Sequence, residues 1–159
     1  MKLNTKSRYA IMAMVDLASQ GASACVSLSL IAERQNLPLQ YLEQLFSKLR
    51  RSNLVKSARG INGGYELAQP ASKIRIYDII LSTDAPVKVT RCNSQEIKGC
   101  HTTGKQCNSH HLWNELERLL HDYLIQVSLQ DVVNGDHSHP IVVLNPKKID
   151  CKINSKEIA

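Results

Sequence analysis

Residues 27–53 read SLSLIAERQNLPLQYLEQLFSKLRRSN, a stretch that predicts two helices separated by a tight turn. Ser27 can cap a short helix from Leu28 to Gln35, because its side-chain oxygen can accept a hydrogen bond from a free backbone N–H of the first turn. Asn36 can adopt the left-handed conformation that ends such a helix. The chain then turns at once into a second helical pattern.

The second pattern is a strongly amphipathic helix that we expect from Pro38 through Asn53. Proline suits the first position of a helix, where a missing N–H is tolerated. Apolar residues repeat at helical spacing, at Leu39, Leu42, Leu45, Phe46 and Leu49. The opposite face carries side chains that can hydrogen-bond base edges or phosphates: Gln40, Tyr41, Glu43, Gln44, Ser47, Lys48 and Arg51. A short helix, a tight turn and such a helix are typical of a DNA-binding helix-turn-helix.

A glycine-rich hairpin is expected directly after these helices. The strand-like runs Leu54–Ser57 and Tyr65–Leu67 flank the tip ARGINGG, residues 58–64. After a helix-turn-helix, such a hairpin is a wing, in which Arg59 can enter a minor groove while the backbone of Gly60, Gly63 and Gly64 approaches phosphates. A plain hairpin with a flexible tip is the alternative interpretation.

Two kinds of DNA contact are expected from these elements. The candidates for phosphate contacts are Lys48, Arg50, Arg51 and Lys56. The candidates for reading base sequence or groove shape are Gln40, Tyr41, Glu43, Gln44 and Arg59. Leu28 and Gly60 complete the predicted DNA-binding set.

The flanking segments complete a mainly α fold with a small β-wing. A first helix is expected from Asn4 or Thr5 to about Gln20, and residues 74–81 are expected to form a short strand and helix. We therefore assign residues 1–84 to a winged helix-turn-helix domain. This is also the basic half of the chain, since residues 1–91 hold 13 Lys and Arg against 6 Asp and Glu, and residues 92–159 hold 7 against 8.

Residues 85–111 form a cysteine-rich loop with the spacing Cys92-x7-Cys100-x6-Cys107-x2-His110. The loop has few apolar side chains to order it by burial. No apolar run of about 18 residues occurs, so the chain is expected to be cytoplasmic, where a structural disulfide is unusual and clustered thiols indicate a metal site. Three thiolates and an imidazole suit either zinc or an iron-sulfur cluster, and the spacing does not decide between them. His101 and His111 are alternatives to His110 as the fourth ligand.

A long amphipathic helix follows the loop. Its apolar residues are Leu112, Trp113, Leu116, Leu119, Leu120, Tyr123, Leu124 and Val127. This stripe is wider than the small remaining core requires, and it favours a helix that binds a second subunit. We assign residues 112–134 to this dimerisation helix and a short C-terminal helix, and the polar residues 135–159 to a disordered tail.

Several of these motifs together resemble the IscR family of iron-sulfur cluster regulators, over residues 1 to about 134. The matching segments are KSRYA at residues 6–10, YLEQLFSKLR at 41–50, Arg59-Gly60 with Gly63-Gly64-Tyr65, and the cysteine loop followed by His-x2-Trp. The intervals between the cysteines are longer here than in that family. The related regulator NsrR is less similar, because it uses an aspartate near the N-terminus, where this chain has Lys6-Ser7-Arg8.

The resemblance implies a homodimeric regulator that carries a [2Fe-2S] cluster on Cys92, Cys100, Cys107 and His110. Such a regulator represses cluster-assembly genes when it is loaded, can activate other genes, and receives its cluster from the assembly machinery. It also implies that Glu43 helps to discriminate between two classes of double-stranded DNA site, since a carboxylate accepts from cytosine N4 and repels nearby phosphate.

Other functions remain open at this point. The metal could be structural zinc, the cluster could sense nitric oxide or redox state, or the chain could be a cluster carrier that does not touch DNA. An enzyme using Cys107 as nucleophile with His110 or His111 as base is not expected, because the sequence indicates neither an oxyanion donor nor an orienting acid.

Overall fold

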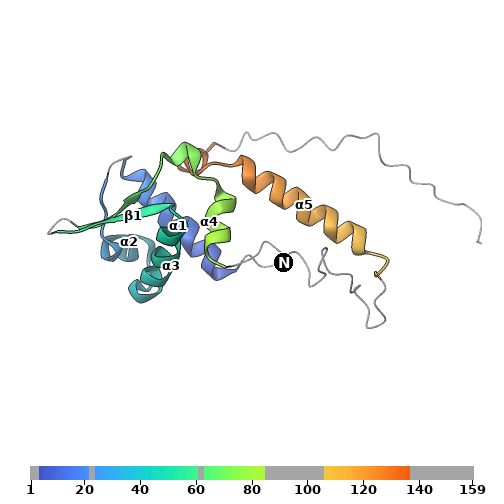
Figure 1. Ribbon diagram of the computed structural model, residues 1–159, viewed down its shortest axis with the longest axis horizontal. Coiled ribbons are helices and arrows are strands. Elements are labelled where there is room, and N and C mark those ends of the chain that lie inside the picture. Colours follow the sequence, from blue (N-terminus) through green and yellow to red (C-terminus); the bar gives the residue numbers. More distant parts are fainter. Residues whose placement is uncertain (1–3, 22–23, 61–62, 85–105, 137–159) are drawn as a thin grey trace, which may run out of the picture.

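The computed structural model describes residues 4–21, 24–60, 63–84 and 106–136 (Figure 1). The elements follow in the order α1 (Thr5–Ser19), α2 (Leu28–Gln35), α3 (Leu39–Arg51), β1 (Val55–Ala58), β2 (Gly64–Leu67), the 3-10 turn η1 (Ala71–Lys73), α4 (Ile76–Ser82), α5 (His110–Gln126) and α6 (Leu129–Asn134). The predicted mainly α fold with a small β-wing is confirmed. Cys92, Cys100 and the tail beyond residue 136 lie outside the described residues.

Most of the predicted helix ends are confirmed. Asn4 caps α1 by accepting from Lys6 N, and Ser27 caps α2 by accepting from Leu30 N at 3.3 Å. Asn36 ends α2 in the left-handed conformation, with φ of 51°. These ends were predictable because each cap acts within a few residues of its own position.

The predicted limits of the second helix were wrong by one residue at its start and two at its end. Pro38 is the cap and not the first helical residue, and α3 ends at Arg51. The cause of the early end is local, since Asn53 takes the left-handed conformation, with φ of 56°, and redirects the chain into β1.

The core lies where α1 packs against α2, α3, α4 and α6. Its fully buried side chains include Met14 from α1, Leu42, Phe46 and Leu49 from α3, and Ile79 from α4. The apolar row predicted for the second helix therefore faces this core, except that Leu39 is exposed. The polar row is left on the outside of the domain.

The hairpin of β1 and β2 is antiparallel, with Val55 opposite Leu67 and Ala58 opposite Gly64. A short third segment lies beside it, because Val26 and Tyr65 exchange backbone hydrogen bonds of 2.9 and 2.8 Å. Gly64 is required at this point, since a Cβ atom there would collide with the carbonyl of Val26. The wing is thus attached to the segment that leads into α2.

The C-terminal helix α6 returns to the N-terminal core. Leu129 N donates to Ile74 O at 2.8 Å, Ile76 N donates to Val127 O at 3.0 Å, and Leu129 is fully buried. A capping box of Ser128 and Asp131 begins α6. Helix α6 therefore packs with α1 and η1, although it was predicted together with α5 as part of the dimerisation segment.

Helix α5 projects from the body of the domain and packs mainly against α4 (Figure 1). Within α5, His110 is the buried residue, and Leu112 is 62% exposed. Tyr123 and Ile125 are also exposed. In the part of the chain that the structure describes, no helix is long and apolar enough to cross a membrane.

Candidate nucleic-acid interface

The exposed side of α3 carries most of the polar residues predicted to contact DNA. Gln40, Glu43, Gln44, Arg50 and Arg51 are exposed. Tyr41 and Lys48 are half-buried, and at 100° per residue they share one flank of the helix, seven residues apart. The structure therefore brings the predicted α3 residues onto one continuous outer surface.

The Tyr41–Lys48 flank of α3 is fixed by contacts to other helices. The rings of Tyr41 and Tyr9, from α1, meet edge-on with centroids 5.7 Å apart. Lys48 Nζ lies 2.6 Å from Asp84 Oδ2, at the end of α4. Asp84 was not among the predicted site residues, because 36 residues separate it from Lys48 and no local pattern pairs them.

Helices α1 and α2 are joined by a polar contact of Asp16 with Arg34 and Gln35. The Asp16 carboxylate accepts hydrogen bonds from Arg34 and from Gln35 Nε2, the latter at 2.8 Å. Burial of the Asp16 side chain raises its pKa, but the hydrogen bonds from Arg34 and Gln35 and the charge of Arg34 outweigh burial and leave that pKa below its ordinary value. Asp16 is therefore ionised at neutral pH and holds α2 against α1.

The described part of the wing exposes the two residues predicted to approach DNA. Arg59 and Gly60 are exposed, and Gly60 has φ of 120°, a conformation that favours glycine. Lys56 and Glu66, which face each other across the two strands, form an ion pair of 3.3 Å. Lys56 is thus partly neutralised, which its sequence position did not indicate.

On α2, the two leucines near the start of the helix differ in exposure. The predicted DNA-contacting residue Leu28 is half-buried and packs against the core, whereas Leu30 is exposed. In sequence alone the two are hard to separate, because both lie in the first turn. Leu30 is thus the more accessible apolar residue at this edge.

Two of the four predicted cluster ligands lie in the described chain, at the start of α5. Cys107 O accepts from His110 N at 3.0 Å, so both residues belong to one turn. Cys107 is half-buried, with its Sγ 3.5 Å from Ser109 Oγ, and His110 is buried. Within residues 4–21, 24–60, 63–84 and 106–136, no three His, Cys, Asp or Glu side chains lie close enough to hold a metal ion.

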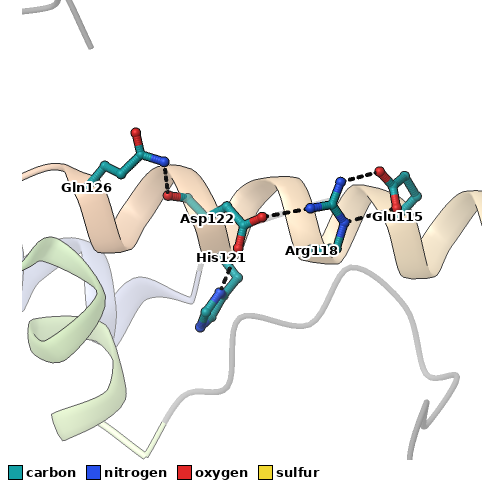
Figure 2. Close-up of polar contacts among 5 residues, drawn as sticks. All are labelled: Glu115, Arg118, His121, Asp122 and Gln126. Atoms are coloured by element: carbon teal, nitrogen blue, oxygen red, sulfur yellow. Dashed lines mark hydrogen bonds and ion pairs between the residues drawn. The ribbon is translucent and has the colours of Figure 1, made fainter. Parts of the chain in front are cut away.

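Polar contacts within α5 support this helix where it leaves the body. Figure 2 shows Arg118 between Glu115 and Asp122, with Nε 3.1 Å from Glu115 Oε2 and Nη1 2.9 Å from Asp122 Oδ2. The hydrogen bond from Arg118 holds the pKa of Glu115 below its ordinary value. His121 Nδ1 is 3.2 Å from Asp122 Oδ1, and its ring meets Tyr77 of α4 edge-on. The pairs that Arg118 forms with Glu115 at i,i+3 and with Asp122 at i,i+4 stabilise a helix that has few tertiary contacts.

The family model Rrf2, described as an iron-dependent transcriptional regulator, matches residues 3–135. The chain belongs to the Rrf2 family. Its match extends from the first residues of α1 to the end of α6, so Rrf2 membership covers both the surface on α3 and the start of α5.

A curated Rrf2-type relative supports the same assignment. The chain is 43% identical over 135 residues to the HTH-type transcriptional regulator IscR of Photorhabdus laumondii, which covers 85% of this chain and 80% of the relative. This Rrf2 chain is accordingly a DNA-binding transcription regulator and not an enzyme, as the sequence predicted.

Solved structures similar to this Rrf2 chain include regulators with different names. CymR, the global cysteine regulator of B. subtilis, matches with a TM-score of 0.70 and 32% identity, covering 85% of this chain and 98% of CymR. IscR of T. potens matches with a TM-score of 0.68 and 33% identity, covering 85% of this chain and 88% of that protein. The Rrf2 winged-helix architecture is shared by both, so the signal sensed must be inferred from this chain's own residues.

Proposed function

We propose that this Rrf2 chain is a cytoplasmic iron-sulfur-cluster-sensing regulator that binds double-stranded DNA as a homodimer. Its DNA-binding half comprises α2, α3 and the wing. Its sensing half comprises the cysteine loop and the start of α5. The observation that carries the proposal is that three clustered cysteines and one histidine lead directly into α5 in a chain of an iron-dependent regulator family.

On DNA, α3 enters the major groove and the wing contacts the neighbouring groove. Gln40, Tyr41, Glu43, Gln44 and Arg59 read base edges or groove shape. The residues assigned to phosphate or close backbone contact are Lys48, Arg50, Arg51, Lys56, Leu28 and Gly60. The exposure of the α3 row and of Arg59 supports these roles, because a side chain must reach the groove to read it.

The homodimer forms through α5. A single chain exposes Leu112 and Tyr123 there, and the half-buried Leu116 and Leu119 lie on the same face of α5 at 100° per residue. Burial of such a stripe against a second copy removes apolar surface from water. A two-fold dimer also presents two α3 helices to two half-sites.

Cys92, Cys100, Cys107 and His110 would hold a [2Fe-2S] cluster supplied by the cluster-assembly machinery. Soft thiolates and an imidazole suit iron-sulfur ligation. Cys107, half-buried in the turn that leads into α5, and His110, buried at the first residue of α5, give the site a shielded side, which supports the assignment. When bound, the cluster supplies a sensing group whose histidine ligand makes it easier to lose than an all-cysteine cluster. The loaded form represses cluster-assembly genes, and the change in occupancy alters which DNA sites, including activated ones, are bound.

Anaerobic purification with visible absorption, iron and acid-labile sulfide assays tests the sensing half. Wild type should be brown-red, Cys92→Ala should lose the colour, and Cys25→Ala should keep it as the matched control. The DNA sites selected from a random-duplex pool should then differ between wild type and Cys92→Ala. A colourless wild-type protein that contains zinc would contradict cluster sensing, and a coloured protein that binds no duplex would indicate a cluster carrier.

A further inference from the structure

One carboxylate lies among the cations of the DNA-facing surface. Lys48 Nζ and Asp84 Oδ2 are 2.6 Å apart, although the Asp84 side chain is 79% exposed and that of Lys48 is 30% exposed. Lys48 is one of the residues assigned to phosphate contact. In the free protein its charge is therefore already paired.

Two further cations lie close enough to influence the same carboxylate. The pKa of Asp84 is lowered first by the hydrogen bond and charge of Lys48, and then by the charges of Lys6 on α1 and Arg51 on α3. The pKa of Asp84 is thus lowered by three cations, two of them on α3 and one on α1. Lys6, which is exposed near the start of α1, was not among the predicted DNA contacts.

Asp84 is held in this position by the backbone and by its buried neighbour. Its φ of 55° is left-handed, a conformation that Asp and Asn tolerate better than most residues. The preceding residue, Thr83, is buried, and its hydroxyl bonds Ser7 Oγ at 3.1 Å and Ile80 O at 2.8 Å. The backbone conformation and the contacts of Thr83 therefore place the Asp84 carboxylate beside α3.

We propose that Asp84 is an internal counter-ion that sets how strongly the basic surface binds DNA phosphate. In the free protein Asp84 pairs with Lys48, and on binding a phosphate replaces it as the partner of Lys48. Nonspecific binding rests almost wholly on phosphate contacts, so Asp84 lowers affinity for any duplex and favours sites that base contacts also hold. The inference rests on the proposed placement of α3 against DNA.

Binding of a mixed-sequence duplex by Asp84→Asn tests the proposal directly. Asparagine keeps the shape and tolerates the left-handed backbone while removing the charge. We expect about twofold to fivefold tighter binding per subunit at low salt. The slope of the logarithm of the binding constant against the logarithm of salt concentration, measured between about 50 and 200 mM salt, should become more negative by up to about 0.9 for each lysine freed. Asp84→Gly also suits the left-handed backbone conformation, and it should show the same gain in affinity and the same steeper salt dependence.

Two controls separate a specific pair from a general change of charge. Asp78→Asn removes an exposed carboxylate from α4, the helix that ends just before Asp84, and it should tighten binding less than Asp84→Asn. In a Lys48→Ala background, Asp84→Asn should lose most of its effect. Equal gains from Asp78→Asn and Asp84→Asn, or an undiminished gain without Lys48, would overturn the role of Asp84. Wild type that binds the duplex with no salt dependence would instead overturn the placement of α3 against DNA.

Discussion

The ring of Phe46, on α3, meets the ring of Tyr65, on β2, edge-on with centroids 4.9 Å apart. Phe46 is fully buried, and Tyr65 is the residue whose backbone also pairs with Val26 ahead of α2. One aromatic contact therefore joins α3, the wing and the approach to α2. The two elements proposed to contact adjacent grooves are held in a fixed relation because they share this packing.

Replacement of Phe46 by leucine should destabilise the domain by about 1–3 kcal/mol, because it removes the edge-on ring contact and leaves unfilled volume. Urea unfolding at fixed protein concentration measures the loss. Tyr65→Phe is the matched control, since it keeps both rings and should remain within about 0.5 kcal/mol of wild type. Equal stability of the two variants would show that the ring pair contributes little.

Replacement of Asp16 by asparagine should lower stability by about 1–2 kcal/mol near neutral pH, because Arg34 and Gln35 lose a charged acceptor. The Asp16 side chain is 4% exposed and that of Arg34 is 37% exposed, which places the expected cost at this modest level.

The Asp16 contribution should also depend on pH in one direction. The folded pKa lies below the ordinary value of 3.8, so the stabilisation is fully present above that value and is lost as pH falls through the folded pKa. A double-mutant cycle with Arg34→Gln, run at about pH 6 and about pH 3, should give a smaller coupling at the lower pH. A coupling that grew on acidification would contradict this assignment.

Replacement of Glu43 by alanine should change the ratio of affinities between DNA sites and not affinity in general. Glu43 is exposed on α3, where a carboxylate can accept from cytosine N4. Competition binding against duplexes that differ only at a cytosine position should show about 1–3 kcal/mol less discrimination. Glu33→Ala, an equal charge change on the exposed side of α2, should leave the ratio as in wild type. If Glu43→Ala left the ratio of affinities unchanged, Glu43 would not contribute to recognition of the DNA sequence.

Replacement of Leu112 by glutamate should dissociate the proposed homodimer without unfolding the chain, because this side chain is 62% exposed in the single subunit. A charge buried without a partner at a subunit contact is strongly unfavourable. Sedimentation equilibrium should give a monomer, with the helical circular dichroism of wild type. Leu81→Glu, at a side chain 57% exposed on α4, is the control and should remain dimeric. A Leu112→Glu protein that stays dimeric would place the contact elsewhere.

Local sequence was sufficient for the helix-turn-helix and its caps. Ser27 and Asn36 act on backbone groups within the same short segment, so their identity and spacing carry the information. The alternation of apolar and polar residues in α3 likewise predicted which row would be outside, because a helix can bury only one face against a small core. The clustered thiols indicated metal chemistry for a comparable reason, since the donor set is a property of residue type.

Tertiary structure alone decided the long-range relationships. Asp84 reaches Lys48, Val26 pairs with Tyr65, and Leu129 returns to Ile74, each across dozens of residues. The spacing of apolar residues along the chain does not specify these three contacts, because they depend on how the helices pack around the core that includes Phe46. The Lys48 charge that we propose binds DNA phosphate is therefore paired with a carboxylate that only the folded chain brings beside it.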